Sequence, residues 1–219
     1  MEIIKKLVSE TMYDIKCPYP MKPEFIVVHN TANDSTAMNE INYMITNAHK
    51  TSFHYAIDDK NIIQGIPENR NAFHAGDGVN GIGNRKGLSI EICYSKSGGS
   101  RFIEAEKLAA KFIAYKLKEK DWGIDRVKKH QDFSGKYCPH RTLDMGWQRF
   151  LNMVQAELNA LKGADKVANK KEDNTPSAWA QEAWDWAVKN KITDGTRPKD
   201  MATREEIITM LYRFKEVIK

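Results

Sequence analysis

The 219-residue chain lacks any long run of apolar residues, and this absence excludes a membrane-spanning protein. A spanning helix needs about 18 or more consecutive apolar residues, and no stretch of the sequence approaches that length. The first residues, MEIIKKLVSE, also lack the apolar segment of a secretory signal peptide. We therefore expect a protein that has no membrane partner and carries no export signal of its own.

Cysteine and net charge are also low. The three cysteines, Cys17, Cys93 and Cys138, are odd in number and widely spaced, which argues against a disulfide framework and leaves room for a metal-binding or reactive thiol. With 34 basic and 29 acidic residues the net charge is +5. This bias is too small to indicate a nucleic-acid partner, but it is compatible with a polyanionic surface.

Aromatic residues are absent from residues 163–176, where charged and small residues dominate. This composition is typical of a solvated linker. The chain is longer than the roughly 150 residues of a typical domain. We therefore predict one large domain over residues 1–161, a linker over 162–176 and a small domain over 177–219. The sequence contains no internal repeat.

In the large domain, short β-branched or alternating runs are interspersed with helical patterns. We predict strands at about residues 25–29, 53–57, 62–64, 88–92 and 126–129, and helices at about residues 41–48, 104–120 and 143–161. The turn at 58–61 makes the second and third strands a hairpin. Glu91 points away from the apolar face of its strand, because alternate side chains point to opposite faces. Strands mixed with helices indicate a layered α/β or α+β domain with a central sheet.

Three polar residues, His29, Glu91 and His130, lie at or near the ends of predicted strands, where sheets commonly present reactive groups. Cys138 follows His130 by eight positions across a glycine-containing loop, which is long enough to bring both side chains to one ion. Two imidazoles and a thiolate suit zinc, and three protein ligands leave a fourth position for water, as in catalytic sites. Taken singly, each residue is more often structural, so the prediction depends on the combination.

The other histidines have more than one interpretation. His54 is interpreted as a packed sheet residue. His74 lies in the loop AFHAGDG, where it either lines a substrate cleft or is structural. We interpret His140 and Arg141, which follow Cys138 and a proline, as structural.

Five motifs connect these residues to a known family. They are FIVVHNTA at residues 25–32, SFHY at 52–55, AFHAG at 72–76, SIEI at 89–92 and KHQDFSGKYCP at 129–139. In this order they resemble the zinc-dependent N-acetylmuramoyl-L-alanine amidase family, which includes phage endolysins and peptidoglycan recognition proteins. The resemblance covers roughly the first 160 residues. It implies a mixed central sheet flanked by helices, a shallow cleft, and His29, His130 and Cys138 as Zn²⁺ ligands.

One departure from the family bears on catalysis. Some relatives carry a catalytic tyrosine at the position of Phe53, which has no ionisable group. By likeness to the endolysins that use a glutamate, Glu91 is the predicted general base, while Tyr55 is interpreted as a core residue.

The predicted reaction is hydrolysis of the amide bond between N-acetylmuramic acid and L-alanine in peptidoglycan. Zinc lowers the pKa of its water to about 7, and Glu91 takes the proton and passes it to the departing amine. Lys136 either stabilises the oxyanion or is a solvated loop residue. The expected protein is a phage or prophage endolysin that stays in the host cytoplasm until a membrane pore admits it to the cell wall.

Residues 177–219 read as helix, loop and helix, with Ser177 capping the first helix and a Thr203–Glu206 capping box opening the second. The three tryptophans of the first helix either form a compact core or stack on sugars. The segment resembles a single surface-layer homology repeat. This resemblance implies binding to an anionic cell-wall polymer, with Arg204 as the contact. Because one repeat is present, either chains pair as a homo-oligomer or the helices dock on the large domain.

Two other functions compete with this prediction. A peptidoglycan-binding protein on the same fold would not cut its ligand, and such binders commonly lack the thiolate ligand that Cys138 provides. A zinc-stabilised nucleic-acid module is excluded, because the sequence offers no closed four-ligand site and little basic excess.

Overall fold

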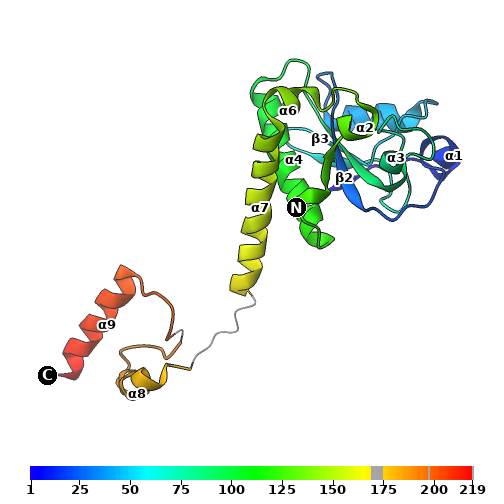
Figure 1. Ribbon diagram of the computed structural model, residues 1–219. Coiled ribbons are helices and arrows are strands. Elements are labelled where there is room, and N and C mark those ends of the chain that lie inside the picture. Colours follow the sequence, from blue (N-terminus) through cyan, green and yellow to red (C-terminus); the bar gives the residue numbers. More distant parts are fainter. Residues whose placement is uncertain (169–174, 197, 219) are drawn as a thin grey trace. The chain divides into compact units, whose positions relative to one another are not determined.

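The computed structural model describes residues 1–168, 175–196 and 198–218, and the side chains of 164–168 are not described (Figure 1). The chain divides into two compact units, Met1–Lys162 and Gly163–Lys219. None of the described helices combines the length and the apolarity that a membrane span requires.

A six-stranded sheet forms the centre of the first unit, in the order β1-β4-β3-β5-β2-β6. Its strands are β1 (Ile4–Lys5), β2 (Phe25–Asn30), β3 (Tyr55–Ile57), β4 (Ile62–Gln64), β5 (Gly87–Ile92) and β6 (Val127–Lys129). The β3–β4 hairpin is antiparallel, and the other neighbouring pairs are parallel. This mixed sheet confirms the predicted fold class. The short edge strand β1 was not predicted, because two exposed residues carry no periodic signal.

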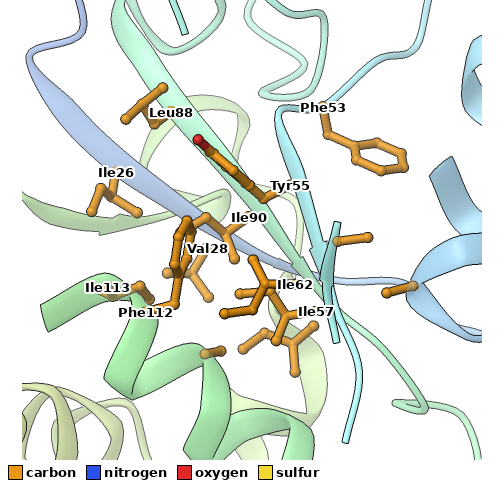
Figure 2. Close-up of a cluster of buried hydrophobic side chains, with 14 of the residues drawn as sticks. Ile26, Val28, Phe53, Tyr55, Ile57, Ile62, Leu88, Ile90, Phe112 and Ile113 are labelled. Carbon is orange, nitrogen blue, oxygen red and sulfur yellow. The ribbon is translucent and has the colours of Figure 1, made fainter. Parts of the chain in front are cut away.

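Helices surround this sheet. They are η1 (Glu10–Met12), α1 (Tyr13–Lys16), α2 (Ala37–Thr46), α3 (Ile82–Lys86), α4 (Gly99–Glu119), η2 (Ile124–Arg126), α5 (Gln131–Ser134), α6 (His140–Asp144) and α7 (Trp147–Ala168). The long helix α4 packs on one face, and Figure 2 shows its Phe112 and Ile113 beside Ile26 and Val28 of β2. These residues and their neighbours on β3 and β5 form the main apolar core.

The helix α2 packs against β3 and β4. Its Ile41 and Met44 reach the backbone at Gly65, where an added Cβ would lie 2.5 Å from the end of Met44. Glycine at this position therefore allows the close approach of α2, and a larger residue would displace the ends of the Ile41 and Met44 side chains.

Helix boundaries differ from the prediction at two glycine turns. The helix α4 begins at Gly99 rather than near Glu104, because Gly98 and Gly99, both at positive φ, turn the chain into it. The predicted helix over 143–161 is divided by Gly146, whose φ is +101°, into α6 and α7. Glycine adopts such angles without strain, so each one bends the chain where apolar periodicity alone gives no signal.

The helix α7 also continues past its predicted end, to Ala168. Residues 162–168 of the predicted linker are therefore helical, as their alanine and lysine residues favour. Residues 169–174 of that linker lie outside the described residues.

The second unit contains η3 (Ala178–Ala180), α8 (Gln181–Lys189) and α9 (Arg204–Val217). The predicted capping box is present, because the Thr203 hydroxyl accepts from the Glu206 N–H and the Glu206 carboxylate accepts from the Thr203 N–H. Ser177 precedes η3 without a side-chain capping bond. The tryptophans do not form a buried core, since Trp179 is 90% exposed and no residue of α8 or α9 is buried.

Candidate metal centre

Three potential ligands meet at one edge of the sheet. His29 is the penultimate residue of β2, and His130 directly follows β6. Because β2 and β6 are parallel neighbours, their carboxyl ends lie together. Cys138 lies between α5 and α6 and completes the group. The ligand atoms of these three buried residues all lie within 4.8 Å of one another.

The geometry and chemistry of this cluster fit one metal ion. The His29 Nδ1 atom lies 3.0 Å from the His130 Nδ1 atom and 3.9 Å from the Cys138 sulfur. Two imidazole nitrogens and one sulfur are a donor set that suits zinc. Burial, and then the proximity of His74, His130 and Lys136, hold the pKa of His29 well below its usual range, and burial also lowers the pKa of His130. Both rings are therefore neutral, which is the form that binds metals.

Glu91 lies beside the cluster. It is paired in register with His29 on the neighbouring strand β5, so the two side chains share a face of the sheet. Its Oε2 atom is buried without a hydrogen-bond partner. Burial and then the charge of Glu40 raise the pKa of Glu91 to about 8, while Lys136 lowers it. A carboxyl group whose pKa is close to neutral is suited to general acid–base chemistry.

Sequence reasoning missed Glu40, a partly buried residue of α2 that accepts a hydrogen bond of 2.6 Å from the Asn33 amide. Its charge acts on Glu91 although the two residues belong to different elements. No pattern in the sequence places them together.

Lys136 is exposed on the loop before Cys138. Its positive charge lowers the pKa of His29, Glu91, His130 and Cys138. The charge therefore acts on the whole cluster, although the Lys136 side chain is exposed.

His74 is buried, and its Nδ1 atom lies 3.0 Å from the His29 Nε2 atom. The His29 ring thus contacts His130 through one nitrogen and His74 through the other. This second contact was not predicted, because 45 positions separate the two residues and only folding brings them together. The substrate contact predicted for His74 stays a prediction.

The residues interpreted as structural have structural partners. His54 bonds Ser89 and the carbonyl of Arg70, while His140 and Arg141 both donate to the carbonyl of Ser95.

The structure also shows where Tyr55 and Phe53 lie, the two aromatic residues at the segment where some relatives carry a catalytic tyrosine. Tyr55 is a core residue, as predicted, and its hydroxyl donates to Glu68 over 2.6 Å. It pairs with Ile90, so it lies on the face opposite Glu91 and the metal cluster. Phe53 is buried. Neither supplies a base to the cluster, which leaves Glu91 as the carboxyl group beside it.

Comparison with known proteins places this site in a family. Residues 19–141 match the family model for N-acetylmuramoyl-L-alanine amidase. The chain belongs to this family. It is similar to the N-acetylmuramoyl-L-alanine amidase CwlA of Bacillus subtilis (strain 168), with 58% identity over 183 residues, covering 81% of this chain and 67% of that protein. XlyB of the same strain is 58% identical over 165 residues, covering 75% of this chain and 52% of that protein.

Solved structures of the family share the fold. The structure of PlyL has a TM-score of 0.69 and 55% identity, and the match covers 70% of this chain and 97% of that one. The solution structure of the PlyG catalytic domain has a TM-score of 0.69 and 52% identity, and it covers 72% of this chain and 96% of that one.

The second unit lies beyond the residues that match the family model. Arg204 is exposed there as the first residue of α9. A pocket of about 570 Å³ in this unit has an acidic lining with one arginine: Asp194, Asp200, Glu205, Glu206 and Arg213. Its charge does not suit an anionic polymer, so the predicted contact by Arg204 depends on the exposed Arg204 side chain and not on this pocket.

The raised pKa of Glu91 gives a test of its surroundings. Its folded pKa of about 8 lies above the ordinary 4.5, so the folded protein holds a proton that the unfolded chain releases. Below about pH 4.5 the Glu91 carboxyl is protonated in both states, so its raised pKa does not lower the free energy of unfolding. Above pH 8 the buried carboxyl is ionised, and the free energy of unfolding is lower by on the order of a few kcal/mol. We expect Glu91→Gln to stabilise the metal-free protein at pH 9 but not at pH 4.5, as measured by urea unfolding. An equal effect at both pH values would contradict this account of the site.

Proposed function

We propose that the protein is a zinc-dependent amidase that hydrolyses the bond between N-acetylmuramic acid and L-alanine in peptidoglycan. The observation that carries this proposal is the buried convergence of His29, His130 and Cys138 beside the carboxyl group of Glu91. Membership of the amidase family supports the choice of substrate. The chain spans about half to two thirds of the curated relatives that it matches, so the activity of the whole protein is part of the proposal.

His29 and His130 would hold the metal through ring nitrogens, and Cys138 through its sulfur. Zinc, when bound, activates water at neutral pH and polarises the carbonyl group of the substrate. Burial and then the charge of Glu91 raise the pKa of Cys138 to about 11, so its thiol must lose a proton when a metal binds.

Glu91 would act as the general base. Its unpartnered oxygen accepts the proton of the attacking water and returns it to the amine of the departing L-alanine. A cation held by the neighbouring ligands would favour the carboxylate form of Glu91, and so would lower its pKa from about 8.

Lys136 would place its ammonium group on the oxyanion that forms during attack. The side chain is exposed, so it can follow the substrate, and its charge acts on the cluster. His74 would orient the His29 ring through their contact, because partners of a ligating histidine fix its orientation. Contact between His74 and the substrate remains our prediction from the sequence.

The second unit would bind an anionic polymer of the cell wall through Arg204, whose planar guanidinium suits pyruvyl or phosphate groups. Because only one repeat is present, chains would pair through this unit to complete the binding site. We propose that the protein acts at the bacterial cell wall as a phage or prophage endolysin.

The decisive experiment measures release of N-terminal alanine from purified cell walls. We expect the native protein to release it, and Glu91→Ala and Cys138→Ser to lose at least about 100-fold in rate, because they remove the base and a metal ligand. Glu104→Ala, at an exposed position of α4, is the matched control and should retain full activity. A native protein that binds walls without releasing alanine would be the non-catalytic binding protein instead.

The role of Lys136 is tested separately. We expect Lys136→Met to lower kcat by about 10² to 10³, as for loss of an oxyanion donor, with zinc content unchanged. Lys111→Met, on the exposed side of α4, serves as the control. Activity close to that of the native protein would place Lys136 outside the reaction.

Wall anchoring is tested on the full chain. We expect Arg204→Ala to weaken binding to intact walls about tenfold, in line with loss of a charged hydrogen-bonding group, while hydrolysis of soluble muropeptides stays unchanged. Binding is measured by co-sedimentation with walls. Unchanged binding in Arg204→Ala, and in a chain ending at Lys162, would remove the anchoring role.

A further inference from the structure

Asn30, the last residue of β2, connects two distant segments of the first unit. It is 6% exposed. Its Oδ1 atom accepts hydrogen bonds from the N–H groups of Arg141 and Thr142, at 3.0 and 3.2 Å. Its Nδ2 group donates to the carbonyl of His29 and to the Thr142 hydroxyl, at 3.1 and 3.4 Å. The amide therefore uses two acceptor and two donor positions, which is its full capacity.

These bonds supply the cap that α6 lacks. The residue before this helix, Pro139, makes no side-chain capping bond, and the first N–H groups of any helix have no partner within it. Arg141 and Thr142 are the second and third residues of α6. An N-capping side chain normally serves these positions, so Asn30 caps α6 from a strand more than a hundred positions away.

The capped helix begins directly after a proposed metal ligand. Cys138 and Pro139 immediately precede α6, so the position of the helix end determines where the Cys138 backbone lies. Burial raises the pKa of the Cys138 thiol, while a hydrogen bond from the backbone N–H of Asn30 lowers it. Asn30 is itself held by pairing with Ile92 of β5, and His29 is its neighbour. Backbone and side chain of Asn30 thus act on the same ligand from a rigid strand.

We propose that Asn30 is a positioning residue of the metal centre, which holds the Cys138 sulfur at the distance from His29 that one shared zinc ion requires. The inference rests on the proposed function and extends it to a residue that does not touch the metal or the substrate. Asn30 lies within the motif FIVVHNTA, and a polar side chain at the end of a buried strand was the signal that sequence reasoning passed over.

The first test compares two buried asparagines. Asn30→Ala removes the cap of α6. Asn71→Ala removes another buried amide, which accepts from the Tyr19 N–H. Zinc affinity is measured by competition with a chelator, and the melting temperature is measured on the metal-free protein. We expect Asn30→Ala to bind zinc about 10- to 100-fold more weakly, as for other residues that support metal ligands. We expect Asn71→Ala to lose thermal stability while keeping native zinc affinity.

A spectroscopic test follows the sulfur itself. In protein loaded with Co²⁺ instead of zinc, the sulfur-to-cobalt charge-transfer band reports whether Cys138 is a ligand. We expect this band to weaken or shift in Asn30→Ala. Asn30→Asp keeps an acceptor for both N–H groups but loses the donor to the His29 carbonyl, so it should restore part of the band and of the zinc affinity.

Native zinc affinity and an unchanged cobalt band in Asn30→Ala would overturn the inference, whatever happens to thermal stability. If this variant does not fold, Asn30→Gln replaces it, because it keeps the amide but displaces it by one methylene group. Native affinity in Asn30→Gln would then overturn the inference, and weaker binding with an altered band would support it. A native protein that binds no zinc would contradict the proposed function instead, before any variant is compared.

Discussion

The parallel pairing of β2 with β5 on one side and β6 on the other is the constraint on which the proposed active site depends. This pairing places His29 beside Glu91, and it brings His130 to the carboxyl ends of the same parallel strands. A shift of one position would send the His29 side chain to the opposite face, because side chains alternate along a strand. Packing of α4 against Ile26 and Val28 disfavours such a shift, because it would place the polar His29 side chain in the apolar core.

The strand register brings several polar groups together in the protein interior, where burial of such groups lowers the stability of the fold. Imidazoles and a thiol lie within 4.8 Å of one another on the same sheet face as a carboxyl group, and burial shifts each of their pKa values toward the uncharged form. Such groups are tolerated when they bind an ion or one another. The contacts of the cluster follow the second solution, since His74 contacts His29 on the side away from the candidate ligands and Asn30 holds the segment that carries Cys138. The buried polar groups at this edge of the sheet lower the stability of the fold, and burial of the apolar core offsets this loss.

The two units differ in how they use apolar residues. The first buries Tyr55, Phe112 and their neighbours completely, and its helices and strands support one another. In the second unit Ile192 is the buried hydrophobic residue among those described, and α9 exposes Ile208 and Leu211 at 68% and 60%. A segment this small buries little surface on its own. The capping box of α9 therefore provides local order in a unit whose helices have almost no core.

Local patterns were sufficient for much of the first unit. The strand at β2, the β3–β4 hairpin and the strand β5 could be predicted, because alternation and turn residues are properties of neighbouring residues. The cluster of His29, His130 and Cys138 was predicted from strand ends, ligand chemistry and the family resemblance, since His29 lies more than a hundred positions from the other two. Where glycine turns interrupted a helical pattern, at Gly99 and Gly146, the boundaries were wrong. The sequence by itself determined which side chains could bind a metal and which faces had to be buried. Only the tertiary structure decided that His74 contacts His29, that Glu40 acts on Glu91 and that Asn30 caps α6, because these contacts join different elements and exist only once strand register and helix packing are set.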